Sequence, residues 1–252
     1  MSEVNNDAGL SRREDGRANN ELRPIRFQNH IAPHAAGSTL IQWGNTQVIC
    51  ACSVEESVPR WMREQDKPGG WLSAEYSMLP YSTLGRKPRD ISKGRIDGRS
   101  TEIQRLIGRS LRAGVHLEKL GERSLWVDCD VLQADGGTRT AAITGAFVAL
   151  RLAIARLLET GQLEEDPIRT PIAAVSVGVV DGEPRLDLPY VEDAAADVDM
   201  NLVMTGEGRY VEVQGSGEEA DFSSEELATL LDYGRQGAER LFELQRQALA
   251  EL

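Results

Sequence analysis

The stretch Asp128–Leu152, DCDVLQADGGTRTAAITGAFVALRL, reads as a buried strand, a glycine turn and a long apolar helix. No charged residue stands between Thr140 and Leu150, so the helix is apolar on nearly every side and is predicted to lie at the centre of the fold. Arg139 stands where this helix begins. A helix N-terminus carries a partial positive charge, so an arginine there is misplaced unless it shares an anion with the free backbone N–H groups.

The turn that leads into this helix, Gly136-Gly137-Thr138-Arg139, has the composition of an anion-binding turn. Two glycines allow the backbone to approach a ligand without obstruction by a Cβ atom. Turn amides, a threonine hydroxyl and an arginine guanidinium are donors that suit phosphate oxygens. The pattern is neither a GxxxxGK[ST] nucleotide loop nor a GxGxxG dinucleotide turn. The alternative is a glycine turn followed by a solvent-exposed arginine.

A second helix, predicted over about 99–117, also begins on an arginine. Its apolar side, at 100° per residue, carries Ile103, Leu106, Ile107, Ser110, Gly114 and Leu117. The opposite side carries Arg105, Arg109 and Arg112. Arg99 has the angular position of Leu106 and Ser110, so it is expected to face the core. Two arginines at helix starts, one of them pointing inward, favour a shared anion.

Positive charge is concentrated in one part of an otherwise acidic chain. The 252 residues carry a net charge of −12, yet the span Arg86–Arg112 has nine cations and three acids, a local net charge of +6. Such a segment predicts a surface that binds anions. The alternative is a solvated loop and helix face.

Acidic residues gather in a different segment, 187–201, with the sequence DLPYVEDAAADVDMN. Little positive charge within the segment balances its five acids, Asp187, Glu192, Asp193, Asp197 and Asp199. Mg²⁺ prefers carboxylate oxygens, usually one or two of them together with waters and phosphate. The segment is therefore either a magnesium site or an acidic surface loop.

Short strand patterns occur in runs before and between the helices, which predicts an α+β fold rather than a strictly alternating parallel sheet. The expected strands are 23–29, 38–44, 46–56, 69–79, 124–133, 170–180, 183–190, 200–205 and 209–215. A last amphipathic helix is expected over 224–252. Residues 21–252 are expected to form a single domain, and the polar residues 1–20 a flexible tail.

Several other classes of protein and site are disfavoured by composition. No apolar run approaches the roughly 20 residues of a membrane helix and the N-terminus lacks a signal-peptide core, so we expect a cytoplasmic protein with no membrane partner. Cys50, Cys52 and Cys129 lie in strand-like apolar stretches without a second Cys/His pair, which predicts buried reduced thiols rather than a zinc site. The three histidines are scattered and no GxSxG is present, so no nucleophile arrangement is indicated.

Five long motifs in the same order resemble the ribonuclease PH family of bacterial phosphorolytic tRNA nucleotidyltransferases. They are GWLSAEYSMLPYST, GRSTEIQRLIGRSLRA, LWVDCDVLQADGGTRTAAITGA, AAVSVGVVDG and DLPYVEDAAADVDMNLVMT. The resemblance extends from about Leu22 to the C-terminus. It implies a fold related to the second domain of ribosomal protein S5 and a homohexameric ring built as a trimer of dimers. It also implies the reaction, in which inorganic phosphate attacks the last phosphodiester of an RNA 3′ end and releases a nucleoside diphosphate.

The resemblance also implies roles for individual residues. The phosphate-binding arginine of the family matches Arg99, and its GTR phosphate motif matches Gly137, Thr138 and Arg139. Its pair of essential aspartates, which hold Mg²⁺ or Mn²⁺ and assist departure of the leaving group, matches Asp193 and Asp199. Basic residues that grip the tRNA acceptor stem correspond to Arg86 and Arg89. Tyr81 departs from the family, which commonly has arginine after MLP, whereas Asn201 is the usual residue two positions past the second aspartate.

Two other functions compete with this one. The first is a non-catalytic RNA-binding ring subunit of an exosome-like assembly, but such subunits typically lose the phosphate arginines or the aspartates, and all four are present here. The second is a small-molecule kinase on a similar fold, but the glycine-rich ATP loop is missing. The sequence therefore favours a phosphorolytic exoribonuclease that trims the 3′ ends of RNA, especially tRNA.

Overall fold

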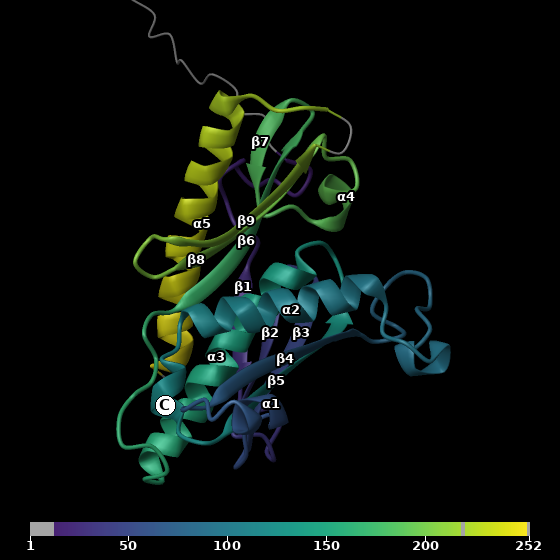
Figure 1. Ribbon diagram of the computed structural model, residues 1–252. Coiled ribbons are helices and arrows are strands. Elements are labelled where there is room, and N and C mark those ends of the chain that lie inside the picture. Colours follow the sequence, from purple (N-terminus) through teal and green to yellow (C-terminus); the bar gives the residue numbers. More distant parts are fainter. Residues whose placement is uncertain (1–12, 218–219, 251–252) are drawn as a thin grey trace, which may run out of the picture.

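Two β-sheets share one hydrophobic core in the computed structural model, which describes residues 13–217 and 220–250 (Figure 1). The larger sheet has the order β1-β2-β3-β5-β4, and the smaller sheet has the order β7-β6-β8-β9. All neighbouring strands are antiparallel except β4 and β5. The expectation of an α+β fold is confirmed, and the larger of two buried clusters contains side chains from both sheets.

The bounds of the elements lie close to those expected from the sequence. The strands are β1 (Ile25–Asn29), β2 (Gly37–Trp43), β3 (Thr46–Glu55), β4 (Trp71–Met78), β5 (Ser124–Gln133), β6 (Ile172–Val180), β7 (Glu183–Leu186), β8 (Val198–Thr205) and β9 (Tyr210–Gly217). The helices are α1 (Arg60–Glu64), α2 (Gly98–Ala113), α3 (Thr138–Glu159), α4 (Tyr190–Asp193) and α5 (Ser224–Leu249), with 3-10 turns η1 (Asp90–Lys93) and η2 (Leu117–Leu120). The two short helices α1 and α4 were not expected.

The central helix is α3, as its apolar sequence predicts. It packs on β2, β3 and β5 of the larger sheet and on β6 of the smaller one. A Cβ atom on Gly37 of β2 would lie 2.3 Å from the carbonyl oxygen of Ala149, so the strand and helix backbones are in close contact. Among the described residues α3 alone is long and apolar enough to cross a membrane, but 78% of its most apolar window is buried inside the fold. Its apolar character is therefore accounted for by the core.

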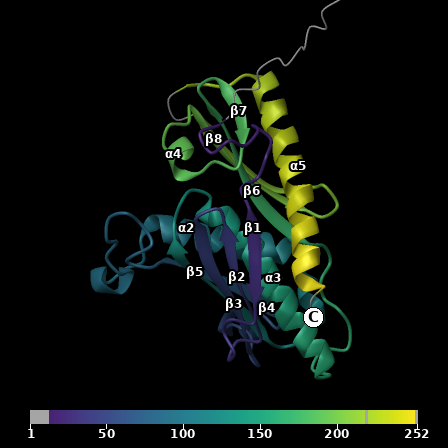
Figure 2. The same cartoon turned by 180° about the vertical axis from the view of Figure 1, so that it is seen from behind.

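The long helix α5 joins the two sheets from outside. It packs on β6, β7 and β8 of the smaller sheet and reaches β1 of the larger one, and Figure 2 shows it running along both. Its N-terminus has a capping box in which Ser223 and Glu226 exchange side-chain and backbone hydrogen bonds. The expected helix continued to residue 252, and its last two residues lie outside the described part of the chain.

Two expected elements end early, each for a local reason. The helix expected to reach residue 117 ends at Ala113, because Gly114 caps it and Val115 forms a β-bridge with Ile168. The strand expected over 183–190 ends at Leu186, because Asp187 has a φ of +57°. That left-handed conformation turns the chain out of the sheet and toward α4.

The segment 13–20 differs from the expected flexible tail, of which residues 1–12 lie outside the described part of the chain. Arg13 and Arg17 are buried, with 3% and 8% of their surface exposed. The carbonyl oxygen of Asn19 accepts a hydrogen bond of 2.7 Å from the amide of Leu186. This segment therefore packs against the end of β7.

The three cysteines are buried and reduced, as expected. Cys50 and Cys129 lie opposite each other on β3 and β5. Burial raises the pKa of Cys52 to about 12, so its thiol stays protonated and unreactive at neutral pH.

Candidate active site

The predicted anion-binding turn connects β5 to α3. Gly136 and Gly137 both have left-handed backbones, with φ of +71° and +65°. A Cβ atom on Gly136 would lie only 2.4 Å from the carbonyl oxygen of Leu188, in the chain that follows β7. The close approach that requires glycine at position 136 is therefore made by the backbone of the acidic segment.

A cavity of about 430 Å³ opens beside this turn. Its wall contains four residues expected to form the site, Arg99, Gly137, Thr138 and Asp193. The rest of the wall is formed by Met78, Thr83, Leu84, Gly85, Ala134, Gly136 and Tyr190. The cavity thus joins the first turns of α2 and α3 to the end of α4, which are distant in sequence.

Arg99 does not face the core, contrary to the expectation from its angular position. It is exposed, while its neighbour Ser100 is fully buried and continues the inward stripe of Ile103 and Ile107. The buried face of α2 is the one expected from the sequence. At the N-terminal end of the helix, however, the edge of that face borders the cavity. Arg99 therefore points its charge at a solvent-filled space, where an anion can reach it.

Arg139 is half-buried beside this cavity. Its Nη1 donates to Oε1 of Gln214 on β9 at 2.9 Å and lies 3.8 Å from the carboxylate of Glu102 on α2. An arginine at the start of α3 is thus held between α2 and β9 by one amide and one carboxylate.

A buried tyrosine holds the threonine of the turn. The hydroxyl of Tyr76 on β4 donates to Oγ1 of Thr138 at 2.9 Å. Burial raises the pKa of Tyr76, while this hydrogen bond and the positive charges of Arg99 and Arg139 act in the opposite direction. Both guanidinium groups therefore lie near enough to act on the same buried hydroxyl, which also orients Thr138.

The basic loop between β4 and α2 is fastened to the start of α2. Asp97 caps the helix by accepting from the amide of Ser100 at 2.7 Å, and its other oxygen lies 2.7 Å from Nζ of Lys87. The hydrogen bond from Lys87, followed by that from Ser100, lowers the pKa of Asp97 to about 2. The cap that supports Arg99 is therefore the same group that holds the loop.

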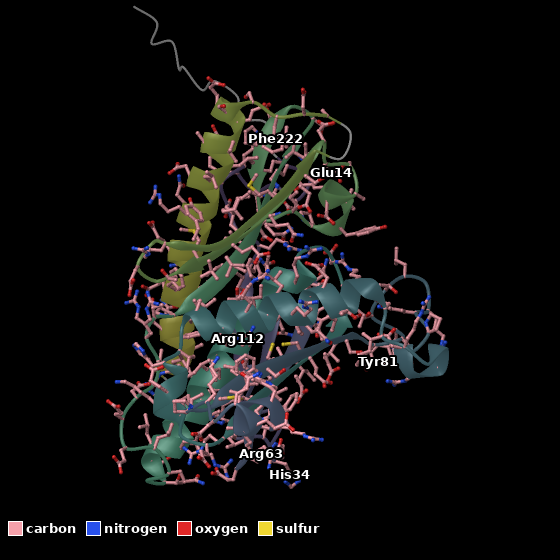
Figure 3. The ribbon with its side chains drawn as sticks, in the orientation of Figure 1. Glu14, His34, Arg63, Tyr81, Arg112 and Phe222 are labelled. Atoms are coloured by element: carbon pink, nitrogen blue, oxygen red, sulfur yellow. The ribbon has the colours of Figure 1, made fainter. Side chains whose placement is uncertain are left out.

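Arg86 and Arg89, the residues expected to grip RNA, are both exposed on this loop. The charge of Arg89 acts on Asp130 of β5. Figure 3 shows Tyr81 at the base of the projecting loop, and 67% of its surface is exposed. The ring of Tyr81 is therefore exposed to solvent at the position where the family commonly has an arginine.

The acidic segment is only partly a candidate metal site. Two of its five acids, Asp187 and Glu192, are buried and bound by arginines from other parts of the chain. Glu192 forms ion pairs with Arg13 and Arg185. Positive charge from the N-terminal segment and from β7 therefore compensates these two acids, although few cations lie within the segment itself. No local pattern in the sequence revealed it.

The buried carboxylate of Asp187 has the largest set of partners in this region. It accepts from the amide of Arg23 at 2.7 Å, from Nη2 of Arg23 at 2.7 Å and from Nε1 of Trp43 at 2.8 Å. Nη1 of Arg17 lies 3.4 Å away. Burial by itself would raise the pKa of Asp187, but the charge and hydrogen bonds of Arg23, with Arg17, hold it below its ordinary value. Asp187 is therefore a charged anchor of the fold.

Asp193 and Asp199 remain as candidate ligands for a metal ion. Asp193 ends α4 and lines the cavity, and Asp199 lies on β8 with Nδ2 of Asn201 3.4 Å from its Oδ2. Within the described ranges no group of three or more His, Cys, Asp or Glu side chains could hold a metal. Two carboxylates completed by phosphate oxygens and water are the donor set that Mg²⁺ accepts, so these residues fit that ion.

Removing the charge of Asp187 should change how stability depends on pH. Because the folded pKa lies below the unfolded value, the carboxylate stabilises the fold above the unfolded pKa, and this contribution is lost as the pH falls below about 4. Asp187→Asn should therefore unfold more easily at neutral pH and show a flatter decline in acid, measured by urea unfolding at several pH values. Asp187→Ala should cost about 3–5 kcal/mol, because buried arginines lose their partner.

Asp221→Asn, at an exposed position, is the matched control and should follow the wild-type pH profile. Parallel acid profiles for wild type and Asp187→Asn would contradict the assignment of Asp187 as a charged anchor.

Comparison with known proteins connects this geometry to a family. Two models of the 3′ exoribonuclease family match the chain, domain 1 over residues 21–155 and domain 2 over residues 170–237. Ribonuclease PH from Geobacillus sp. (strain WCH70) is 54% identical over 244 residues, which cover 95% of this chain and 94% of that protein. The two matched regions correspond to the larger and smaller sheets, although one core spans both.

Solved structures have the same fold. A chain of the Archaeoglobus fulgidus exosome with RNA bound to the active site matches with a TM-score of 0.76 and 25% identity, covering 92% of each chain. Rice (Oryza sativa) Rrp46 matches with a TM-score of 0.75 over 94% of this chain and 100% of its own, and at 20% identity it supports the fold alone. The chain therefore belongs to the 3′ exoribonuclease family, as a phosphate-dependent 3′-to-5′ exoribonuclease of the ribonuclease PH type.

Proposed function

We propose that the cavity between the first turns of α2 and α3 is where inorganic phosphate attacks the last phosphodiester of an RNA 3′ end. The observation that carries this assignment is the presence of Arg99, Thr138 and Asp193 on one cavity wall. Donors for an anion and a carboxylate for a metal thus face the same space, as phosphoryl transfer requires.

The proposed reaction transfers one nucleotide to phosphate. An oxygen of inorganic phosphate bonds to the phosphorus of the terminal phosphodiester while the bond from that phosphorus to the 3′-oxygen of the preceding nucleotide breaks. The products are a nucleoside 5′-diphosphate and an RNA shortened by one residue, whose 3′-oxygen takes up a proton.

Catalysis at such a site consists mostly of positioning and charge neutralisation, because two anions must be brought together. Arg99, from α2, and Arg139, from α3, supply two positive charges near the hydroxyl of Thr138. The turn amides of Gly137 and Thr138 add donors at the start of a long helix, where the helix dipole also favours an anion.

Asp193 and Asp199 are the residues that would hold Mg²⁺ or Mn²⁺. When bound, such an ion neutralises charge on phosphate oxygens and on the departing oxygen. The two carboxylates come from α4 and β8, so their separation depends on how the segment between them is held.

RNA would reach the cavity past the basic loop. Arg86 and Arg89 are exposed on it, and Lys87 ties the loop to the cap of the helix that carries Arg99. We propose tRNA 3′ ends as the main substrate and the cytoplasm as the location. The similarity to ribonuclease PH supports the former, and the buried reduced thiols suit the latter.

We also propose a homohexameric ring built as a trimer of dimers. Relatives that form part of exosomes, such as the Archaeoglobus fulgidus chain, support assembly of this fold into larger complexes. Light scattering of the purified protein should give about six times the 27.7 kDa mass of one chain. A stable monomer would contradict the ring.

The proposed function is tested by incubating the protein with Mg²⁺ and an RNA that has an unstructured 3′ tail, with and without phosphate. Nucleoside diphosphates should appear only when phosphate is present, because phosphate is the nucleophile. Chromatography of the products distinguishes the alternatives. Monophosphates would indicate hydrolysis, and no release at all would favour a non-catalytic RNA-binding subunit.

Loss of either proposed phosphate arginine should slow the reaction strongly. Arg99→Ala and Arg139→Ala should each lower kcat/KM by about 10²–10³-fold, by analogy with removal of one oxyanion donor. Arg105→Ala is the control, since Arg105 is an exposed arginine on the same helix as Arg99 and lines a different cavity, with Trp71 and Arg112. Near-normal phosphate-dependent activity in either site variant would show that the site is elsewhere.

A further inference from the structure

We propose that Arg23 is a positioning residue that fixes the turn 134–138, which contains the phosphate donor Thr138 and leads to Arg139, against the acidic segment 187–193, which contains Asp193. This inference rests on the proposed function, in which the turn binds the phosphate and Asp193 holds the metal ion. Arg23 is itself absent from the cavity wall, so it acts through the segments that it holds.

The guanidinium of Arg23 binds both segments at once. Nε and Nη2 contact the carboxylate of Asp187, with Nη2 to Oδ1 at 2.7 Å and Nε to both oxygens at 3.1 Å. Nη1 donates to the backbone carbonyl of Asp135. Arg23 has only 6% of its surface exposed, so these bonds are shielded from water and from salt.

The two segments are also in direct contact at the point that Arg23 spans. Oδ1 of Asp135 accepts from the amide of Tyr190, the first residue of α4, at 3.3 Å. Gly136 approaches the carbonyl oxygen of Leu188 so closely that a Cβ atom would lie 2.4 Å from it. The backbones of the turn and of the acidic segment are therefore in direct contact. Arg23, which is buried, binds to both of them at this point.

The position of this contact determines the geometry of the cavity. One segment continues directly to Thr138 and the other to Asp193, and both residues are on the cavity wall. A shift of either segment changes the distance between the phosphate donors and the carboxylate while leaving each group intact. Misplacement by about 1 Å in such a site can cost about 10²-fold in rate.

Only a guanidinium group can bind Asp187 and Asp135 at the same time. A planar guanidinium presents donors in several fixed directions, whereas a lysine ammonium is a compact point charge. Lysine at position 23 keeps a positive charge beside Asp187, but it cannot hold that carboxylate in two places and bind Asp135 as well. Arg23→Lys therefore separates the positioning role from charge compensation.

Arg17 provides a matched control. It is also buried, and it also contacts Asp187, through Nη1 to Oδ2 at 3.4 Å and Nη2 to the carbonyl oxygen at 3.2 Å. Its other side-chain hydrogen bonds among the described residues go to Asp15 and Glu21, away from the turn 134–138. Arg17→Lys should weaken the ion pairing of Asp187 while leaving the hydrogen bond between Arg23 and the turn in place.

The experiment compares wild type, Arg23→Lys and Arg17→Lys in phosphorolysis and in binding of inorganic phosphate by calorimetry. Arg23→Lys should lower kcat by about ten-fold or more, as expected for misplaced reacting groups. Its affinity for phosphate should stay close to that of wild type, because the donors on α2 and at the start of α3 all lie on the same side of the contact that Arg23 holds. Arg17→Lys should keep kcat within about two-fold, because it does not touch the turn. Thermal unfolding of all three proteins checks that the difference in kcat is measured on folded enzyme.

Equal values of kcat for Arg23→Lys and Arg17→Lys would overturn the inference, and so would a loss confined to phosphate affinity. If Arg23→Lys does not fold, Asp135→Ala tests the same contact, because it removes the hydrogen bonds that the Asp135 carboxylate accepts from Tyr190 and Asn45 while leaving the ion pairs of Asp187 in place. Asp135→Ala should then lower kcat several-fold, as expected for misplaced reacting groups, and wild-type kcat would overturn the inference. Failure of the proposed function itself is distinguishable, since wild type would then release no diphosphate.

Discussion

The buried carboxylate of Asp187 is the point at which three separate parts of the chain meet. The N-terminal segment reaches it through Arg17 and Arg23, the larger sheet through Trp43, and the smaller sheet through the backbone of β7. Its left-handed φ of +57° is tolerated because its partners fix both the side chain and the backbone around it. A buried charge without partners would be costly, so the segments that supply those partners must stay in place together.

This anchor explains how a site made from distant residues becomes rigid. The turn 134–138 continues from β5 of the larger sheet, whereas the acidic segment leaves β7 of the smaller one. Their contact at Gly136 and Asp135 brings Thr138 and Asp193 to one cavity, and the start of α2 brings Arg99 to the same wall. Tyr76, buried below, orients Thr138 and lies within the field of both arginines. The shape of the cavity thus depends on the contact between the turn that follows β5 and the acidic segment that follows β7.

Sequence patterns predicted what depends on local periodicity and composition. The apolar run of α3 identified the central helix, and two arginines at helix starts indicated a common anion site. The angular position of Arg99 on α2 suggested that it faces the core. Angular position alone does not show whether the end of a helix borders the core or a cavity, and here it borders the cavity. The ion pairs of Asp187 and Glu192 could not be predicted, because their partners lie 164 and 179 residues away for Arg23 and Arg13. Such pairing leaves no periodic pattern in the sequence, so the sequence did not reveal that two of the five acids are paired with distant arginines.

The central claim is that one phosphate is bound by Arg99 and Thr138, on the cavity wall that they share with Asp193, together with Arg139 beside that wall. A crystal structure of the protein grown with phosphate tests this most directly. The account predicts one phosphate ion in the cavity, within hydrogen-bond distance of both guanidinium groups and of the Thr138 hydroxyl, on the side that faces Asp193. Phosphate bound by only one of the two arginines, or an ordered phosphate elsewhere with this cavity filled by water, would contradict it.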